Sequence, residues 1–180
     1  MDNISYSLTD SDIKNSFEDD SDVGVFTYDE LIKKIKKLGF VKLLNSFREK
    51  AIIFLIRQTP KYGHWVAVFL KNSGSEKGIH IFDSYGNKPD AEAWYNGISK
   101  SMRERMGEDA PYLLKELLKT DEALYFNDVK YQGNSDKITT CGKWAVVRVM
   151  CSYMTCSQFE KFINKNTIHQ TPDEFVSSIF

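Results

Sequence analysis

Apolar residues at helical spacing mark the first regular element of the chain, a short amphipathic helix. Thr27 and Glu30 have the spacing of a capping box, and Gly39 stands at a position typical of a helix end. Between them, the apolar residues fall on one helical face: Leu31, Ile32, Ile35 and Leu38. The pattern predicts a helix over residues 27–39 that packs one face against a core.

The pattern then changes to that of extended chain. Residues 51–57 are apolar and β-branched, which is typical of a strand buried on both faces. After a turn signal at 59–63, two further strands are predicted at 65–70 and 78–83, joined by the polar loop 71–76. We expect these two strands to pair as a hairpin.

The apolar residues of this hairpin indicate its register. Placing Val66 opposite Ile81 brings the apolar ladders onto one face of the sheet, and the same count places His64 directly opposite Asp83. Cβ atoms of opposed residues lie about 4.5–5.5 Å apart, so an imidazole and a carboxylate there share a hydrogen bond. His80 has no evident partner in this register.

Helical patterns dominate the second half of the chain. A helix is predicted from Asp90, with apolar residues at every fourth position: Trp94, Ile98, Met102 and Met106. A shorter helix follows Pro111, and residues 123–129 are typical of a fourth strand. Two capping boxes predict two terminal helices: Ser157 with Glu160, and Thr171 with Glu174.

The most apolar helical segment begins at Cys141, capped by Thr139 or Thr140, and runs to about Met154. It is apolar almost all round, which is typical of a helix at the centre of a fold. The sequence therefore predicts an α+β fold. In it, a central mixed or antiparallel sheet packs against a buried helix that carries Cys141 at its N-terminus.

Composition narrows the class of protein. The 180 residues suit one domain, predicted over 23–180, and residues 1–22 hold seven carboxylates against Lys14, which indicates an acidic, flexible arm. The net charge of −1 creates no global field towards nucleic acid. No apolar run approaches the length of a membrane span, and the acidic start is unlike a secretory signal, so we expect a protein that is neither membrane-bound nor secreted.

Three cysteines do not make a disulfide scaffold, so each thiol needs its own explanation. Cys141 stands at a helix start, where unpaired backbone N–H groups and the helix dipole favour a thiolate. A thiolate nucleophile also needs an acid, a group that orients that acid, and an oxyanion donor. His64, Asp83 and Gln132 are the candidates for these roles. Each residue alone is more often structural, and only their joint arrangement points to catalysis.

These residues resemble a known group of enzymes. In chain order, the segments GHWV (63–66), IFDSYG (81–86), Gln132 and TCG (140–142) are similar to the adenovirus maturation protease (adenain) and the SUMO proteases. These are cysteine peptidases with the order His, Asp or Glu, Gln, Cys, whereas in papain-like enzymes the cysteine comes first. The likeness covers roughly residues 51–152 and is closer to the virus, virophage and Polinton-type maturation proteases.

The resemblance implies roles for individual residues. Cys141 is the nucleophile, His64 the general acid and base, Asp83 its orienting group, and Gln132 the oxyanion donor together with the Cys141 backbone N–H. The loop between Gln132 and Cys141 is longer than in those relatives, so Asn134 is an alternative donor. Trp65 is either a wall of the substrate cleft or a core residue.

The remaining sulfur and imidazole groups are better explained by packing. Cys151 and Cys156 have no tight Cys-x-x-Cys spacing, so core packing is favoured over a metal site formed with His169. We expect no cofactor and no metal.

The resemblance also implies a function. We expect a monomeric cysteine endopeptidase that cleaves after small residues such as Gly in viral capsid or other structural precursors, within virions or the host cytoplasm. Three alternatives stay open: an isopeptidase acting on ubiquitin-like modifiers, an acyltransferase using acetyl-coenzyme A, and an inactive peptide-binding module. The need for a peptide or DNA activator also stays open.

Overall fold

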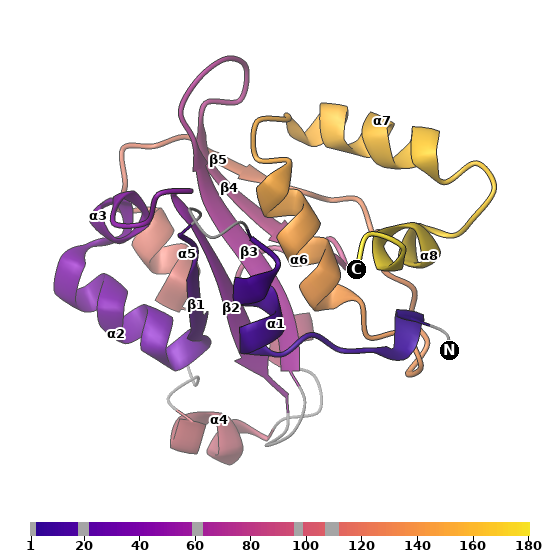
Figure 1. Cartoon of the computed structure of the whole chain (residues 1–180). Coiled ribbons are helices and arrows are strands. Elements are labelled where there is room, and N and C mark those ends of the chain that lie inside the picture. Colours follow the sequence, from indigo (N-terminus) through magenta and orange to yellow (C-terminus); the bar gives the residue numbers. More distant parts are fainter. Residues whose placement is uncertain (1–2, 18–21, 59–62, 96–98, 107–111) are drawn as a thin grey trace.

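A five-stranded mixed sheet forms the centre of the fold (Figure 1). The computed structural model describes residues 3–17, 22–58, 63–95, 99–106 and 112–180. The strands follow one another across the sheet in chain order: β1 (Gly24–Thr27), β2 (Ala51–Arg57), β3 (Gly63–Lys71), β4 (Gly78–Asp83) and β5 (Leu124–Phe126). The inner pairs are antiparallel, and the two edge strands run parallel to their neighbours. The predicted α+β class with a mixed sheet is confirmed.

Helices cover both faces of this sheet and divide the core in two. One face packs against α2 (Tyr28–Leu38), α3 (Phe40–Asn45), η2 (Glu92–Tyr95) and α5 (Tyr112–Leu117). The other packs against α1 (Asp10–Asn15), α6 (Cys141–Met150), α7 (Cys156–Asn166) and α8 (Pro172–Ser177). Two further elements complete the described chain, η1 (Asn3–Ser5) and α4 (Lys100–Met106). β2, β3 and β4 contribute side chains to both cores, which explains their nearly continuous apolar character.

Elements specified by local signals form where the sequence predicts them. In α2, the Thr27 backbone N–H donates to Glu30 Oε2 at 2.9 Å, as a capping box requires, and Gly39 follows the helix with a φ of +81°. Thr171 and Glu174 form the predicted box at α8. For α7 the predicted box is wrong: Thr155 and Gln158 form it, two residues before Ser157 and Glu160.

The helix predicted from Asp90 is also wrong in its start. Asp90 has a φ of +58° and its carboxylate instead accepts hydrogen bonds from the Tyr28 hydroxyl and the Leu114 backbone N–H, so it joins α2 to α5. Regular structure begins with η2 and resumes in α4. Ile98, Pro111 and most of the turn expected at 59–63 lie outside the described residues.

The predicted hairpin register is wrong by two residues. Val66, not His64, is the partner of Asp83, and Val68 lies opposite Ile81. Side chains alternate with a period of two, so this shift leaves every residue on its expected face. His64 is therefore a diagonal neighbour of Asp83 rather than the residue directly opposite.

The acidic N-terminal segment packs against the domain where it is described. Ile13 of α1 is fully buried and Leu8 nearly so, both within the core beneath α6. The Thr139 backbone N–H donates to the Ile4 carbonyl at 3.0 Å. Residues 3–17 thus lie along the start of α6, beside the cleft described below.

Candidate active site

His64 and Asp83 form a buried pair at one end of the sheet. His64 lies at the start of β3 and Asp83 at the end of the antiparallel strand β4, so the two meet at the same edge. His64 Nε2 and Asp83 Oδ1 are 2.8 Å apart, and both side chains are almost completely buried. This bond holds the imidazole by one nitrogen and leaves Nδ1 for another partner.

Several donors converge on the Asp83 carboxylate. Oδ1 also accepts the Tyr85 backbone N–H at 2.7 Å, while Oδ2 accepts Trp94 Nε1 at 2.6 Å and Asn87 Nδ2 at 3.2 Å. Burial raises the pKa of Asp83, but the His64 hydrogen bond and charge, with the other donors, hold it below its usual value. Because an ionised carboxylate only accepts hydrogen bonds, this environment keeps Asp83 charged.

Asn127 fixes the backbone of the same residue. The Asp83 N–H donates to Asn127 Oδ1 at 2.9 Å, and Asn127 Nδ2 donates back to the Asp83 carbonyl at 2.7 Å. This reciprocal pair holds the end of β4 against the chain that follows β5. The carboxylate therefore sits on a rigid support.

Cys141 is the first residue of α6, and its thiol contacts His64. Burial raises the Cys141 pKa, but the hydrogen bond and charge of His64, with backbone N–H donors of Trp65 and Gly142, bring it below its ordinary value. Because Nε2 of His64 is engaged by Asp83, Nδ1 is the ring nitrogen that faces the thiol. The structure thus places Cys141 beside the hydrogen-bonded His64–Asp83 pair, with its thiol and the imidazole in the wall of one cleft.

The imidazole at the centre of this chain is favoured in its charged form. Burial lowers the pKa of His64, but the hydrogen bonds and charges of Asp83 and Cys141 outweigh that effect and raise it to about 10. The Cys141 pKa is lowered at the same time, so both shifts favour the thiolate–imidazolium form of the pair. Such a pair combines a nucleophile with an acid at one position.

A cleft of about 670 Å³ opens onto the thiol and the imidazole. Its walls include the His64, Cys141 and Gln132 side chains, the half-buried Tyr85, and the segment Ser7–Asp10 of the N-terminal arm. The Tyr85 ring lies beside His64, with 5.1 Å between the ring centroids. The cleft therefore gives a ligand access to groups that are otherwise nearly buried.

Gln132 is buried in the wall of this cleft and its amide is oriented by hydrogen bonds. Ser84 Oγ donates to Gln132 Oε1 at 2.8 Å, which turns Nε2 towards the Ile138 carbonyl, 3.2 Å away. The backbone N–H groups of Tyr131 and Gln132 both donate to the Ser84 carbonyl. Because Ser84 directly follows Asp83, the same turn of the chain positions both the Gln132 amide and the Asp83 carboxylate.

Asn134, the alternative donor, lies elsewhere. It is exposed, its side-chain oxygen accepts a hydrogen bond from Lys130 Nζ, and it lines a neighbouring hollow that does not include Cys141. Gln132 shares a cleft with Cys141, and Asn134 does not.

Trp65 lies between the core and the cleft. Its indole belongs to the core beneath α6, and it also lines the cleft. Nε1 donates to the Leu8 carbonyl at 3.2 Å, which ties the N-terminal arm to the cleft wall. A side chain at Gly142 would have its Cβ 3.1 Å from this indole and 3.2 Å from Leu8 Cβ, so the start of α6 packs closely here.

Asp173 of α8 anchors the start of α6, and sequence reasoning missed it. Its Oδ1 accepts hydrogen bonds from Thr140 Oγ1 and from Trp144 Nε1, and its Oδ2 accepts the Gly133 N–H at 2.8 Å. Thr140 is therefore at the predicted cap position, but its hydroxyl donates to Asp173 instead of capping the helix. The buried carboxylate connects the loop after Gln132 to the first turn of α6.

The two residues that hydrogen-bond to Asp83 from other elements, Trp94 and Asn127, could be identified only weakly from the sequence. Trp94 is spaced as a core residue of a helix, and Asn127 is one polar residue within a predicted strand. A polar residue that interrupts an apolar strand is a usable sign of a buried hydrogen-bonding role. By contrast, no local pattern connects Asp173 to a helix that begins 32 residues earlier.

Comparison with known proteins gives one relative of known source. No protein family model matches the chain. The chain is 34% identical over 131 residues to a protein of Sputnik virophage named Uncharacterized protein V9, an alignment that covers 72% of each chain. Among the described residues, none of the helices has the length and apolar character needed to cross a membrane.

Proposed function

The chain belongs to the same family as protein V9 of Sputnik virophage, and we propose that it is a cysteine endopeptidase. The observation that carries the proposal is the buried His64–Asp83 hydrogen bond beside Cys141, with the thiol and the imidazole lining one cleft. Burying ionisable groups such as Cys141, His64 and Asp83 side by side costs folding free energy. Groups with strongly shifted pKa values of this kind cluster at functional sites.

In the first step, the Cys141 thiolate attacks the carbonyl carbon of a peptide bond in the cleft. The carbonyl oxygen takes up the electron pair and is stabilised by the Cys141 backbone N–H and by Gln132 Nε2. Protonated His64 donates its Nδ1 proton to the departing amine as the C–N bond breaks. The products are a free amine and an acyl group bound to sulfur as a thioester.

In the second step, water replaces the amine. Neutral His64 accepts a proton from the water, whose oxygen attacks the thioester carbonyl through the same oxyanion site. Collapse of this intermediate releases a carboxylic acid, and the sulfur leaves as thiolate. Asp83 stays ionised throughout and keeps Nε2 of His64 protonated and correctly oriented.

The substrates that fit this setting are structural precursors of a virophage-type particle. The relative comes from a virophage, so the proposed site of action is the infected cell or the assembling particle. Trp65 and Leu8 line the cleft close to the start of α6, and the proposed substrate is an extended chain with small residues before the scissile bond.

The test uses the purified full chain with precursor proteins of its own particle. Wild type is expected to produce discrete fragments, while Cys141→Ala and His64→Ala produce none; Cys151→Ala, at a half-buried cysteine outside the cleft, retains cleavage. Iodoacetamide in stoichiometric amount is expected to abolish cleavage by modifying Cys141. Undiminished cleavage by the Cys141→Ala protein would disprove the proposal.

Assays of the same variants with ubiquitin-like conjugates, acetyl-coenzyme A and peptides separate the other reactions considered for this triad. Cleavage only of ubiquitin-like conjugates identifies an isopeptidase. Transfer of an acetyl group from acetyl-coenzyme A without cleavage identifies an acyltransferase, because another nucleophile then replaces water at the thioester. Peptide binding with an unreactive Cys141 identifies an inactive binding module.

A further inference from the structure

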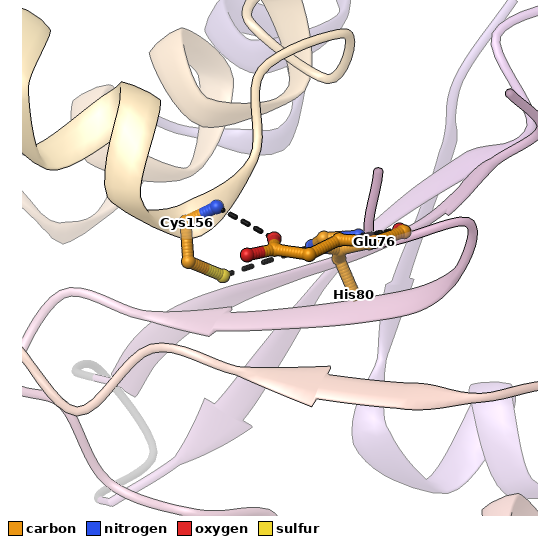
Figure 2. A group of neighbouring side chains, drawn as sticks. All are labelled: Glu76, His80 and Cys156. Atoms are coloured by element: carbon orange, nitrogen blue, oxygen red, sulfur yellow. Dashed lines mark hydrogen bonds between the residues drawn. The ribbon is translucent and has the colours of Figure 1, made fainter. Parts of the chain in front are cut away.

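A second sulfur and imidazole pair lies at the opposite end of β4. Glu76 ends the loop before β4, His80 lies within β4, and Cys156 is the first residue of α7 (Figure 2). One potential ligand atom of each residue lies within 4.8 Å of the other two. The cluster does not include Cys151 or His169, the partners considered for Cys156 from the sequence.

The imidazole of His80 is fixed in both plane and tautomer. Its ring is stacked between Phe69 and Tyr125, at centroid distances of 5.1 and 4.8 Å. Nε2 lies 2.8 Å from the Glu76 carbonyl oxygen, so this nitrogen carries the proton and donates it. In the neutral ring, Nδ1 then has its lone pair directed at Cys156 Sγ, 3.8 Å away. A second nitrogen held by a backbone carbonyl is the usual support of a metal-bound histidine.

The carboxylate of Glu76 is brought to the same point by an unusual backbone. Glu76 has a φ of +54°, a left-handed conformation that side-chain-bearing residues rarely adopt. This turn directs its carboxylate over the start of α7, where Oε2 accepts the Cys156 backbone N–H at 2.8 Å (Figure 2). The other carboxylate oxygen is available as a ligand.

We propose that Glu76, His80 and Cys156 bind a divalent metal ion of the zinc class, with water completing the coordination. Sulfur, imidazole and carboxylate donors together are the ligand set that zinc favours. Nitrogen and sulfur ligands of tetrahedral zinc lie roughly 3.6 Å apart, close to the observed Sγ to Nδ1 distance of 3.8 Å. The three ligand atoms lie within 4.8 Å of one another, so binding draws the more distant pair closer by about 1 Å.

The local charge is compatible with this ion. Arg148 is buried beside Cys156, with its guanidinium held by the Cys151 and Met154 carbonyls and packed over the Phe69 ring. A thiolate and a carboxylate together neutralise a divalent ion, so Arg148 faces a complex without net charge. Its hydrogen bond with the Cys156 side chain acts as an outer contact that favours the thiolate.

A metal at this position joins parts of the chain that are distant in sequence. Glu76 and His80 belong to the β3–β4 hairpin, whereas Cys156 lies 76 residues beyond His80 at the corner between α6 and α7. The site therefore ties the helical layer that carries Cys141 to the sheet that carries His64. Its role is structural, and it does not depend on the proposed peptidase activity.

Cobalt titration of the full chain tests the proposal directly. The Cys141→Ala protein is used throughout, because the Cys141–His64 pair is itself able to bind metal. One equivalent of Co²⁺ is expected to give a thiolate-to-cobalt charge-transfer band. The band is retained with Cys151→Ser added and lost with Cys156→Ser added. A band that persists in the Cys156→Ser protein, or no band in the parent, overturns the proposal.

Two further measurements guard against a variant that fails to fold. Glu76→Gln, at a half-exposed position, is expected to weaken Co²⁺ binding by about tenfold or more with an unchanged circular dichroism spectrum. In the parent protein, Zn²⁺ is expected to slow alkylation of Cys156 about tenfold or more and leave Cys151 unaffected. Binding unchanged in Glu76→Gln, or equal alkylation rates of Cys156 with and without Zn²⁺, would contradict a metal site here.

Discussion

The chain contains two cysteine–histidine pairs that are built alike but whose pKa values are shifted in opposite directions. In both, the cysteine is the first residue of a helix, α6 or α7, and the histidine lies on a strand of the central sheet. At Cys141, the thiol pKa is lowered and that of His64 is raised. At Cys156, burial and Glu76 raise the thiol pKa, and burial lowers that of His80.

The difference arises at the second nitrogen of each imidazole. His64 Nε2 faces the Asp83 carboxylate, which stabilises an imidazolium and, through it, a thiolate. His80 Nε2 faces the Glu76 carbonyl, which holds the neutral tautomer but supplies no full negative charge. Both cysteines begin a helix, so the group that faces the second histidine nitrogen accounts for the opposite pKa shifts. We infer that this group separates the proposed nucleophile from the proposed metal ligand.

Replacing the Asp83 carboxylate tests whether it causes the difference between the two pairs, and this change has the largest expected effect. Asp83→Asn makes the environment of His64 resemble that of His80, so the thiolate–imidazolium pair loses its counter-charge. We expect kcat/KM for peptide cleavage to fall roughly 10³–10⁴-fold, the order of loss found when the triad aspartate of serine proteases is replaced. The iodoacetamide reaction of Cys141 should slow in parallel.

Asp128→Asn, at an exposed carboxylate close to the same sheet end, is the control and should leave both rates unchanged. Retention of more than a tenth of the activity by a folded Asp83→Asn protein would contradict the role given to the carboxylate.

Replacing Gln132, the proposed oxyanion donor, is expected to have the next largest effect, and it concerns the Cys141 pair alone. Gln132→Ala removes the amide that Ser84 orients in the cleft. We expect kcat to fall about 10²–10³-fold with little change in KM. Asn134→Ala should stay within about twofold of wild type, since Asn134 is exposed outside this cleft. Larger damage from Asn134→Ala than from Gln132→Ala would reverse the assignment.

The start of α6 is held by the distant Asp173, whereas that of α7 is held by the local cap residue Thr155. Removing each of them should therefore lower the free energy of unfolding by a different amount. Asp173→Ala leaves the Thr140 hydroxyl, the Trp144 indole N–H and the Gly133 N–H without their acceptor, so the free energy of unfolding should fall by roughly 2–4 kcal/mol. Thr155→Ala removes a local cap of α7 and should cost about 1 kcal/mol. Urea denaturation measures both, and equal losses would argue against Asp173 as the anchor of α6.

The smallest expected effect is on the pH dependence of folding stability through His80. It is measured with a chelator present, so that no bound metal affects His80. The His80 pKa lies below 6.5 in the folded protein, so its stabilising contribution is present above that pH and is lost as pH falls through the folded value. His80→Phe, which keeps the stack between Phe69 and Tyr125, should therefore lose less stability than wild type between pH 7 and 5. An identical acid response of the two proteins would show that His80 does not titrate as described.

His64 is expected to behave in the opposite sense. Its pKa is raised to about 10, so its contribution is fully present below 6.5 and is lost as pH rises towards 10. NMR titration of the imidazole resonances distinguishes the two: at pH 8, His64 should be protonated and His80 neutral. In Asp83→Asn, the His64 resonance should move towards the neutral form.

Sequence reasoning succeeded where the determining interactions are short-range or periodic. The Thr27–Glu30 capping box and the apolar run 51–57 were sufficient to place α2 and β2. His64 and Asp83 were paired correctly despite a register wrong by two residues, since a shift of two preserves the face of each side chain. Caps were less reliable where two neighbouring Ser or Thr residues compete, as at Thr155 and Ser157.

Sequence reasoning failed for contacts between the sheet and the helices or loops that pack against it. Asp173, Trp94 and Asn127 orient the candidate site through hydrogen bonds over long sequence separations. The N-terminal arm gave no periodic signal, yet Leu8 is buried beside Trp65. Such contacts depend on where loops and helices dock, and a single sequence carries no repeating pattern for them.

By itself, the sequence determined the α+β class, the strands of the hairpin, the buried character of α6, and the residue types available for thiol chemistry. These follow from hydrophobic periodicity and local capping, which act within a few residues of each other. Only the tertiary structure decided that His64 has a carboxylate behind it and His80 a carbonyl, and that Asp173 holds the start of α6. The charge of a buried group depends on its neighbours in space, and folding alone brings those neighbours together.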